Sequence, residues 1–321
     1  MIKELNIFLK KENLTMAGLG FSAGLPIMLV FSTLSVWLVK AGIERSTVTL
    51  FSWAGFAYSF KFLWSPIVDK FEIPLLKKIG HRKSWLLLTQ ILIFFSIILA
   101  SYSNPQDNLK FMAIAVVLIA FFSATQDIVI DAFRIESAPE KKQGPLSSMY
   151  LAGYRIAMII SGAGSLWLAS FLGGENYQQN IWKQVYQLIS LFMIIGLTCT
   201  LISKEPKTKN KNKINRFNQI KFTISTILSI IIFFVIFFNF PKINNLDYTF
   251  TFIINIIKIL LSFAASIFTL YILEKIKFLP KKQSQEIFIK PITNFFIRYK
   301  KIAIIILLLI GLYRIADVVM G

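Results

Sequence analysis

The chain has 321 residues, 55% of them hydrophobic, and its mean hydropathy is positive. The apolar residues form blocks of about 18 to 25 residues, the length of a helix that crosses a bilayer core. A net charge of +19 would suggest nucleic-acid binding in a soluble chain, but here the basic residues lie in alternate loops between apolar blocks. Composition therefore excludes an ordinary soluble domain and predicts an all-α, polytopic membrane protein without a nucleic-acid partner.

We predict nine membrane-spanning helices. In chain order they cover residues of about 14–39, 47–66, 84–102, 109–133, 148–171, 184–203, 222–240, 248–274 and 301–319. Lysine and arginine cluster at the N-terminus and in every second loop. The positive-inside rule then places the N-terminus and these basic loops in the cytoplasm.

The spans group into parts with different character. The predicted parts are a six-helix bundle (1–203), a cytoplasmic basic linker (204–221), two additional membrane helices (222–274), a cytoplasmic basic loop (275–300) and a last helical segment (301–321).

Small residues recur at intervals of four in two of the spans, which predicts close helix packing in lipid. The first group is Gly18, Ser22 and Pro26, and the second is Ala157, Ser161 and Ser165.

Several kinds of chemistry are excluded by residue counts and motifs. Cys199 is the only cysteine and His81 the only histidine, so an internal disulfide and a histidine-based metal cluster are excluded. The chain has no G-x-x-x-x-G-K-[ST] motif for ATP and no visible nucleophile–base pair. We therefore expect no enzyme, no metal site and no cofactor.

Charged residues inside membrane spans are costly and indicate function. Counted from the cytoplasmic helix ends, Lys61, Asp127 and Arg155 lie at depths of roughly 10 to 12 Å. We predict that they face one polar cavity, in which Lys61 and Arg155 bind anionic groups and Gln126 and Tyr154 supply neutral hydrogen bonds. Asp127 is the predicted proton carrier. The alternative is that Lys61 pairs with Asp127 only to let both be buried.

For three other charged residues a structural explanation competes with a functional one. Asp131 and Arg134 lie three residues apart at a helix end, where an ion pair near the headgroups is ordinary. Lys258 stands alone in its span and is expected to snorkel toward the membrane surface.

Five stretches occur in the order and at the spacing typical of one transporter family. They are "GFSAGLPIMLV", "FKFLWSPIVDK", "RKSWLLLTQ", "SATQDIVIDAFR" and "GYRIAMIISG". Residues of about 14 to 205 thus resemble the N-terminal half of the AmpG-type permeases, a branch of the major facilitator superfamily. The family pattern has two six-helix halves, so residues 301–321 would be only the first helix of a truncated C-terminal bundle.

The loop after the second span resembles a superfamily signature, an acid followed by a basic cluster. Asp69 fits its start and Arg82 its end, whereas Ser65 stands where a glycine is usual. In the superfamily this loop locks the cytoplasmic gate by pairing with acids at neighbouring helix ends. The resemblance therefore implies gating roles, which compete with substrate binding, for residues that lie near the predicted cytoplasmic surface. They are Asp69, Arg82, Asp131, Arg134 and Glu136.

The resemblance implies proton-coupled import of anhydro-muropeptides, used in cell-wall recycling, across the bacterial inner membrane. Partners would be membrane lipid, the muropeptide and protons. Three alternatives stay open: a truncated or split half-transporter that is inactive alone, a chain completed by a separately encoded C-terminal half or by self-association, and a related permease for another anionic solute such as a coenzyme A ester.

Overall fold

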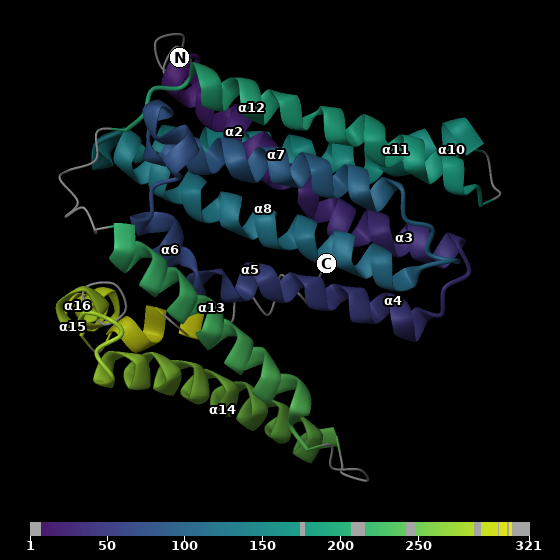
Figure 1. The fold of residues 1–321 in the computed structure, drawn as a ribbon. Helices are drawn as coiled ribbons and strands as arrows, with labels where there is room; N and C mark the ends of the chain where they lie inside the picture. Colours follow the sequence, from purple (N-terminus) through teal and green to yellow (C-terminus); the bar gives the residue numbers. More distant parts are fainter. Residues whose placement is uncertain are drawn as a thin grey trace. The chain divides into compact units, whose positions relative to one another are not determined.

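The computed structural model describes residues 8–173, 177–206, 216–241, 248–285, 290–300, 302–306 and 308–309. Every regular element in these ranges is helical, which confirms the predicted all-α class (Figure 1). The chain divides into two compact units, each considered below by itself. The first comprises Met1–Val68 and Glu72–Lys211, and the second Asp69–Phe71 and Asn212–Gly321.

The helices up to residue 202 follow the hydropathy blocks. They are α2 (Lys11–Val30), α3 (Ser32–Lys40), α4 (Arg45–Phe51), α5 (Phe56–Phe60), α6 (Ser65–Lys70), α7 (His81–Ser101), α8 (Leu109–Ser137), α9 (Gln143–Ile159), α10 (Ser165–Gly173), α11 (Gln179–Leu191) and α12 (Met193–Ile202). Within the described residues, six helical stretches are long and apolar enough to cross a membrane. They are Lys11–Lys40, His81–Ser101, Leu109–Ser137, Glu140–Gly173, Gln179–Ile202 and Ile220–Phe237.

The predicted second span, 47–66, differs from a single regular helix. Between α4 and α5 the chain forms a 3-10 turn at Ser52–Gly55, and a second 3-10 turn at Lys61–Leu63 precedes α6. Pro66 contributes to the break before α6, because a proline has no backbone N–H and restricts the residue before it. The segment is not among the six described helical stretches of membrane length, so the second span stays a prediction, and its irregular geometry was not predicted.

In the first unit, buried aromatic side chains pack where α3 and the end of α2 meet α11. The Trp37 ring stacks on Trp182 with centroids 5.6 Å apart, and its centroid lies 4.7 Å from that of Tyr186. The Tyr186 hydroxyl donates to the Leu29 carbonyl oxygen at 2.9 Å. These buried groups connect α2 and α3 with α11.

Small residues let α2 approach its neighbours closely, as the sequence predicts. A methyl group at Gly18 would meet the Cys199 side chain of α12. On another face of α2, a methyl group at Gly20 would come within 2.8 Å of the Tyr150 carbonyl carbon of α9. One at Gly153 would come within 2.7 Å of the Ala17 carbonyl carbon. The spacing rule found the Gly18 face but missed the contact between α2 and α9.

Ala157, Ser161 and Ser165 are fully buried, which agrees with their predicted packing role. Ser161 also accepts a hydrogen bond at its carbonyl oxygen from the Thr33 hydroxyl, at 2.8 Å. This bond joins α3 to the π-helical turn Ile160–Gly164 between α9 and α10.

The second unit contains a pair of packed helices, α13 (Arg216–Asn239) and α14 (Tyr248–Lys275). The Ser229 hydroxyl lies 2.7 Å from both the carbonyl and the hydroxyl oxygen of Ser266, which joins the two helices. The Lys258 ammonium lies 4.0 Å from the centroid of the Phe237 ring, a cation–π contact within this pair. Lys258 is therefore held by its neighbouring helix.

Two shorter helices follow, α15 (Lys281–Ser284) and α16 (Lys290–Tyr299). In the predicted last segment, 301–321, residues 302–306 and 308–309 are helical, and the other residues lie outside the described ranges. The middle of the predicted linker, 207–215, lies outside them as well. The count of nine spans and the five-part division stay predictions.

Candidate functional site

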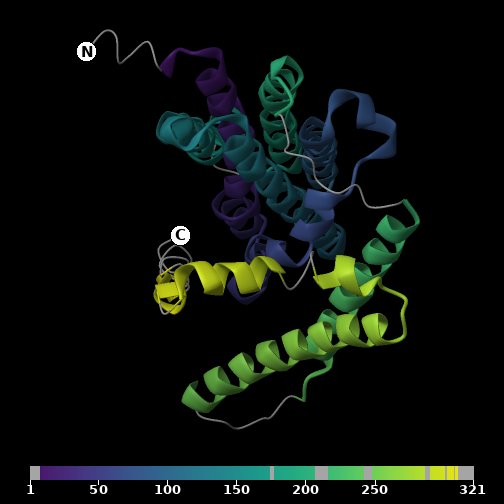
Figure 2. The ribbon, with the colours of Figure 1, turned by 90° about the vertical axis from the view of Figure 1, so that its left-hand side faces the viewer.

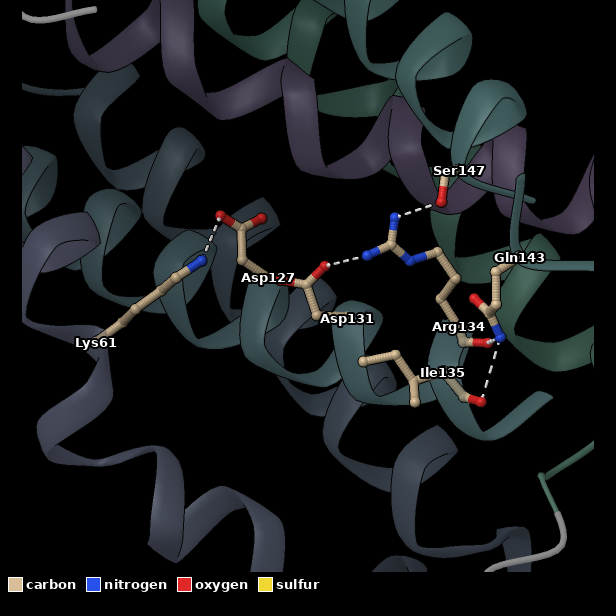
Figure 3. Close-up of polar contacts among 7 residues, drawn as sticks. All are labelled: Lys61, Asp127, Asp131, Arg134, Ile135, Gln143 and Ser147. Atoms are coloured by element: carbon tan, nitrogen blue, oxygen red, sulfur yellow. Dashed lines mark hydrogen bonds and ion pairs between the residues drawn. The ribbon is translucent and has the colours of Figure 1, made fainter. Parts of the chain in front are cut away.

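The structure brings together two of the charges predicted to share a cavity. The Lys61 ammonium lies 3.5 Å from Asp127 Oδ2 (Figure 3). Lys61 comes from the 3-10 turn of the second span and Asp127 from the middle of α8. The two side chains are 24% and 13% exposed, so the pair is neither in open solvent nor sealed in the core.

A nearby contact fixes the turn against α8. Trp64 Nε1 donates to the Thr125 hydroxyl at 3.0 Å, and the Trp64 ring lies 4.9 Å from that of Phe121. Trp64 follows Lys61 by three residues, and Thr125 precedes Asp127 by two. The irregular backbone at Lys61 is thus anchored beside the carboxylate that the lysine meets.

Helical irregularities in transporters and enzymes often mark functional positions. Two such irregularities lie near the predicted charges: the 3-10 turn that begins at Lys61, and the π-helical turn Ile160–Gly164, which begins shortly after Arg155. The functional role of these charges stays a prediction.

Gln126 is directed into the interior of the bundle. Its side chain is fully buried, and its amide nitrogen donates to the Ser22 hydroxyl of α2 at 2.8 Å. Gln90 of α7 lies 3.5 Å from the same hydroxyl and accepts a 3.0 Å hydrogen bond from Thr200 of α12. Gln126 therefore belongs to a polar network that joins four helices, and its contact with a substrate stays a prediction.

Tyr154 and Arg155 lie on α9. The Tyr154 ring tilts against that of Tyr150 with centroids 5.9 Å apart. Arg155 is exposed, and its Nη1 lies 3.9 Å from the sulfur of Met158 in its own helix. The predicted cavity shared by Lys61, Asp127 and Arg155 thus stays a prediction, of which the structure supplies the first two members.

One hollow of about 290 Å³ lies away from these residues, between the start of α2 and the end of α12. Its lining is mostly apolar and comprises Leu9, Lys11, Leu14, Thr15, Cys199 and Ile202. None of the predicted substrate-binding residues contributes to it.

The residues predicted to form a gate show a strong contact at the start of α7. Arg82 is 1% exposed and binds Glu136 of α8 with two bonds, from Nε at 2.9 Å and from Nη2 at 2.7 Å. This is the expected pairing of the basic cluster with an acid at a neighbouring helix end, made by Glu136. Asp69 lies in the last turn of α6, and its gating role stays a prediction.

Glu205 is a member of this contact that sequence reasoning missed. Its two carboxylate oxygens accept hydrogen bonds from the backbone N–H groups of Arg82 and Lys83, at 2.8 and 3.0 Å. The Lys83 ammonium in turn donates to the carbonyl oxygens of Leu201 and Ser203, at 3.0 and 2.9 Å. A carboxylate at a helix N-terminus is stabilising, because it accepts hydrogen bonds from unpaired backbone N–H groups and interacts with the positive end of the helix dipole. The sequence alone does not reveal that an acid so distant in the chain takes this position.

Asp131 and Arg134 form the predicted local ion pair at 3.3 Å. Arg134 also donates to the Ser147 hydroxyl at 2.9 Å (Figure 3). Its guanidinium lies 5.9 Å from the centroid of the Tyr150 ring. The Gln143 amide donates to three carbonyl groups at the end of α8, the shortest bond being 2.8 Å. Arg134 therefore links α8 to α9, and Asp131, which is half exposed, is available to a further partner.

Comparison with known proteins gives a family and several relatives. The sequence profile of the Major Facilitator Superfamily matches residues 14–313. The protein named "Putative transporter AmpG 4" of Rickettsia conorii is 38% identical over 211 residues, which are 66% of this chain and 49% of that protein. The "Anhydromuropeptide permease" of Escherichia coli K12 is 38% identical over 203 residues, 63% of this chain and 39% of that protein.

"Putative transporter AmpG 1" of Rickettsia conorii is 33% identical over 237 residues, 69% of this chain and 56% of that protein. The resemblance to AmpG-type permeases that the five stretches indicate is thereby confirmed. The chain spans about half the length of the curated relatives that it matches.

Proposed function

Because this chain belongs to the Major Facilitator Superfamily, we propose that it functions as an AmpG-like permease for anhydro-muropeptides in cell-wall recycling. Its family and its membrane-length helices make it a multi-pass protein of the bacterial inner membrane and a transporter-type protein, not an enzyme. The observation that carries the proposal is the Lys61–Asp127 ion pair, set at a helix break within the residues that match the superfamily profile.

The pair supplies a way to couple a proton to an anionic solute. With Asp127 ionised, its charge holds the Lys61 ammonium at 3.5 Å. Protonation of Asp127 removes that attraction and frees the lysine for a carboxylate of the muropeptide peptide. In this proposal Arg155 binds a second anionic group, while Gln126 and Tyr154 provide neutral hydrogen bonds.

The contact between Arg82 and Glu136 would then serve the gate. It joins the start of α7 to the end of α8, and Glu205 ties the same turn to the residues after α12. Asp131 and Arg134 lie on α8 between Asp127 and Glu136. Together with Arg82 and Glu136 they form the proposed cytoplasmic gate, and the gating role of Asp69 stays a prediction.

A complementary half or a second copy would complete the substrate site. Of the six candidate spans, Glu140–Gly173 has the lowest buried share, 28% against 61% for Lys11–Lys40. Large apolar side chains on it are exposed: Leu151, Ile156, Ile159, Trp167 and Phe171. We include in the proposal that this face, which also carries Arg155, takes a separately encoded C-terminal half or another protomer.

The test is uptake of labelled anhydro-muropeptide into cells that lack their own permease and express this chain, with and without a proton uncoupler. We expect uncoupler-sensitive uptake that Asp127→Asn abolishes and that Asp107→Asn leaves unchanged, because Asp107 is an exposed loop residue. Uptake by the Asp127→Asn variant at the wild-type rate would show that Asp127 carries no proton.

The same assay separates the two forms of the proposal. If the inserted chain alone gives no uptake, co-expression of the C-terminal half of an AmpG relative is expected to restore it. Absence of uptake in both cases, with insertion confirmed, would contradict the proposed function.

A further inference from the structure

The helix α16 (Lys290–Tyr299) has two chemically distinct faces. Successive residues in a helix are rotated by about 100°, so positions four apart share a face. Lys290, Asn294 and Arg298 follow this spacing on one side. The other side carries Phe295, Phe296 and Tyr299. The exposed Ile297 lies among the polar residues, and the Arg298 guanidinium lies 5.5 Å from the centroid of the Tyr299 ring.

The aromatic face is partly exposed in the part of the chain that the structure describes. The Phe295 ring lies 5.1 Å from Tyr299 and 5.7 Å from Phe296, so the three rings form one cluster. Phe296 is 42% and Tyr299 37% exposed. An exposed aromatic cluster of this kind indicates a surface that meets an apolar partner.

The charge around this helix identifies the partner. Between residues 275 and 301 the sequence has eight lysines and arginines and a single acid, Glu286. Such a strongly basic stretch is attracted to an anionic surface.

The position of α16 in the chain also indicates a membrane surface as its partner. The 28-residue helix α14 precedes the stretch, and an apolar run that is helical at 302–306 follows it. Both flanking segments are membrane spans predicted from the sequence, and a short helix between two such spans is held close to the bilayer surface. The helix α16, drawn yellow in Figure 2, is a separate element after α14 and α15.

We propose that α16 lies in the headgroup layer on the predicted cytoplasmic side and binds anionic phospholipid. The aromatic cluster inserts at the boundary of the acyl chains, and Lys290 and Arg298 bind lipid phosphates. This arrangement is that of an interfacial amphipathic helix, in which apolar insertion and charge attraction act together. Lipid binding by α16 is separate from transport and does not depend on the substrate.

The experiment uses the full chain in lipid nanodiscs, with Cys199→Ser as a cysteine-free background, since Cys199 is the only cysteine. A polarity-sensitive fluorophore is attached at Phe296→Cys, on the aromatic face, or at Asn294→Cys, on the polar face. We expect a lipid-borne quencher to reduce emission at position 296 at least twofold more than at position 294. Aqueous iodide should show the reverse order.

Lipid charge is tested with nanodiscs of phosphatidylcholine alone or with phosphatidylglycerol. Phosphatidylglycerol should increase lipid quenching at position 296 at least twofold, and the double substitution Lys290→Gln/Arg298→Gln should remove that increase. Lys110→Gln, at an exposed lysine outside this stretch, is the matched control and should leave it intact.

Two results would overturn the inference. Equal iodide access at positions 294 and 296 in both lipid mixtures would show that the aromatic face is not inserted. Protection of position 296 from both iodide and the lipid-borne quencher would show that another part of the protein covers the face.

Discussion

The contact between Arg82 and Glu136 makes a quantitative prediction. Arg82 is 1% exposed and forms two charge-assisted bonds, at 2.9 and 2.7 Å, with a carboxylate that is 21% exposed. Arg82→Ala leaves Glu136 without this partner in a mostly buried position, which should cost about 3–5 kcal/mol. Arg82→Lys keeps the charge but loses the planar fork and one of the two bonds, for about 1.5–3 kcal/mol.

The double variant Arg82→Ala/Glu136→Ala removes both charges, so it should be less destabilised than the sum of the single variants. We expect a coupling free energy of about 2–3 kcal/mol, typical of residues in direct contact. The assay is unfolding of the purified protein by increasing SDS, followed by far-UV circular dichroism, for all four members of the cycle. Additive single and double variants would refute the interpretation that this ion pair holds α7 to α8.

Three further substitutions test the packing and the cap in the same unfolding assay. Gly153→Ala should destabilise by about 1–3 kcal/mol because its methyl group meets the α2 backbone, whereas Gly144→Ala, with open space around it, should be neutral or slightly stabilising. Gly80→Ala should cost about 1–3 kcal/mol because φ is +112° there, and a smaller effect would mean that the turn relaxes. Glu205→Gln should cost up to about 2 kcal/mol through the lost charge at the α7 N-terminus, and Glu205→Ala more; equal effects would contradict a charge contribution.

Much of the fold could be predicted because hydropathy and local spacing determine it. Apolar blocks of membrane length predicted the long helices, and the three-residue spacing of Asp131 and Arg134 predicted their ion pair. Depth along the helices was enough to suggest that Lys61 and Asp127 meet. These predictions depend only on residue spacing within one helix or on the depth of a residue in the bilayer.

The features that were missed depend on rotation and on distant partners. Gln126 and Asp127 are neighbours in sequence, but the helical rotation between them directs Gln126 to Ser22 in the interior and Asp127 to Lys61. The partners of Glu205 lie more than 120 residues away, at the start of α7. Spacing within one span cannot supply either relation, because both require the packing of several helices.

In the proposed function, the Lys61–Asp127 pair belongs to the site that binds the muropeptide. The most direct measurement is the affinity of the purified chain for anhydro-muropeptide, by titration calorimetry, for the wild type, Lys61→Met and Lys110→Met. We expect that Lys61→Met weakens binding at least tenfold, about 1.4 kcal/mol, while Lys110→Met binds as the wild type does. Equal affinity of all three proteins would show that Lys61 does not bind the muropeptide.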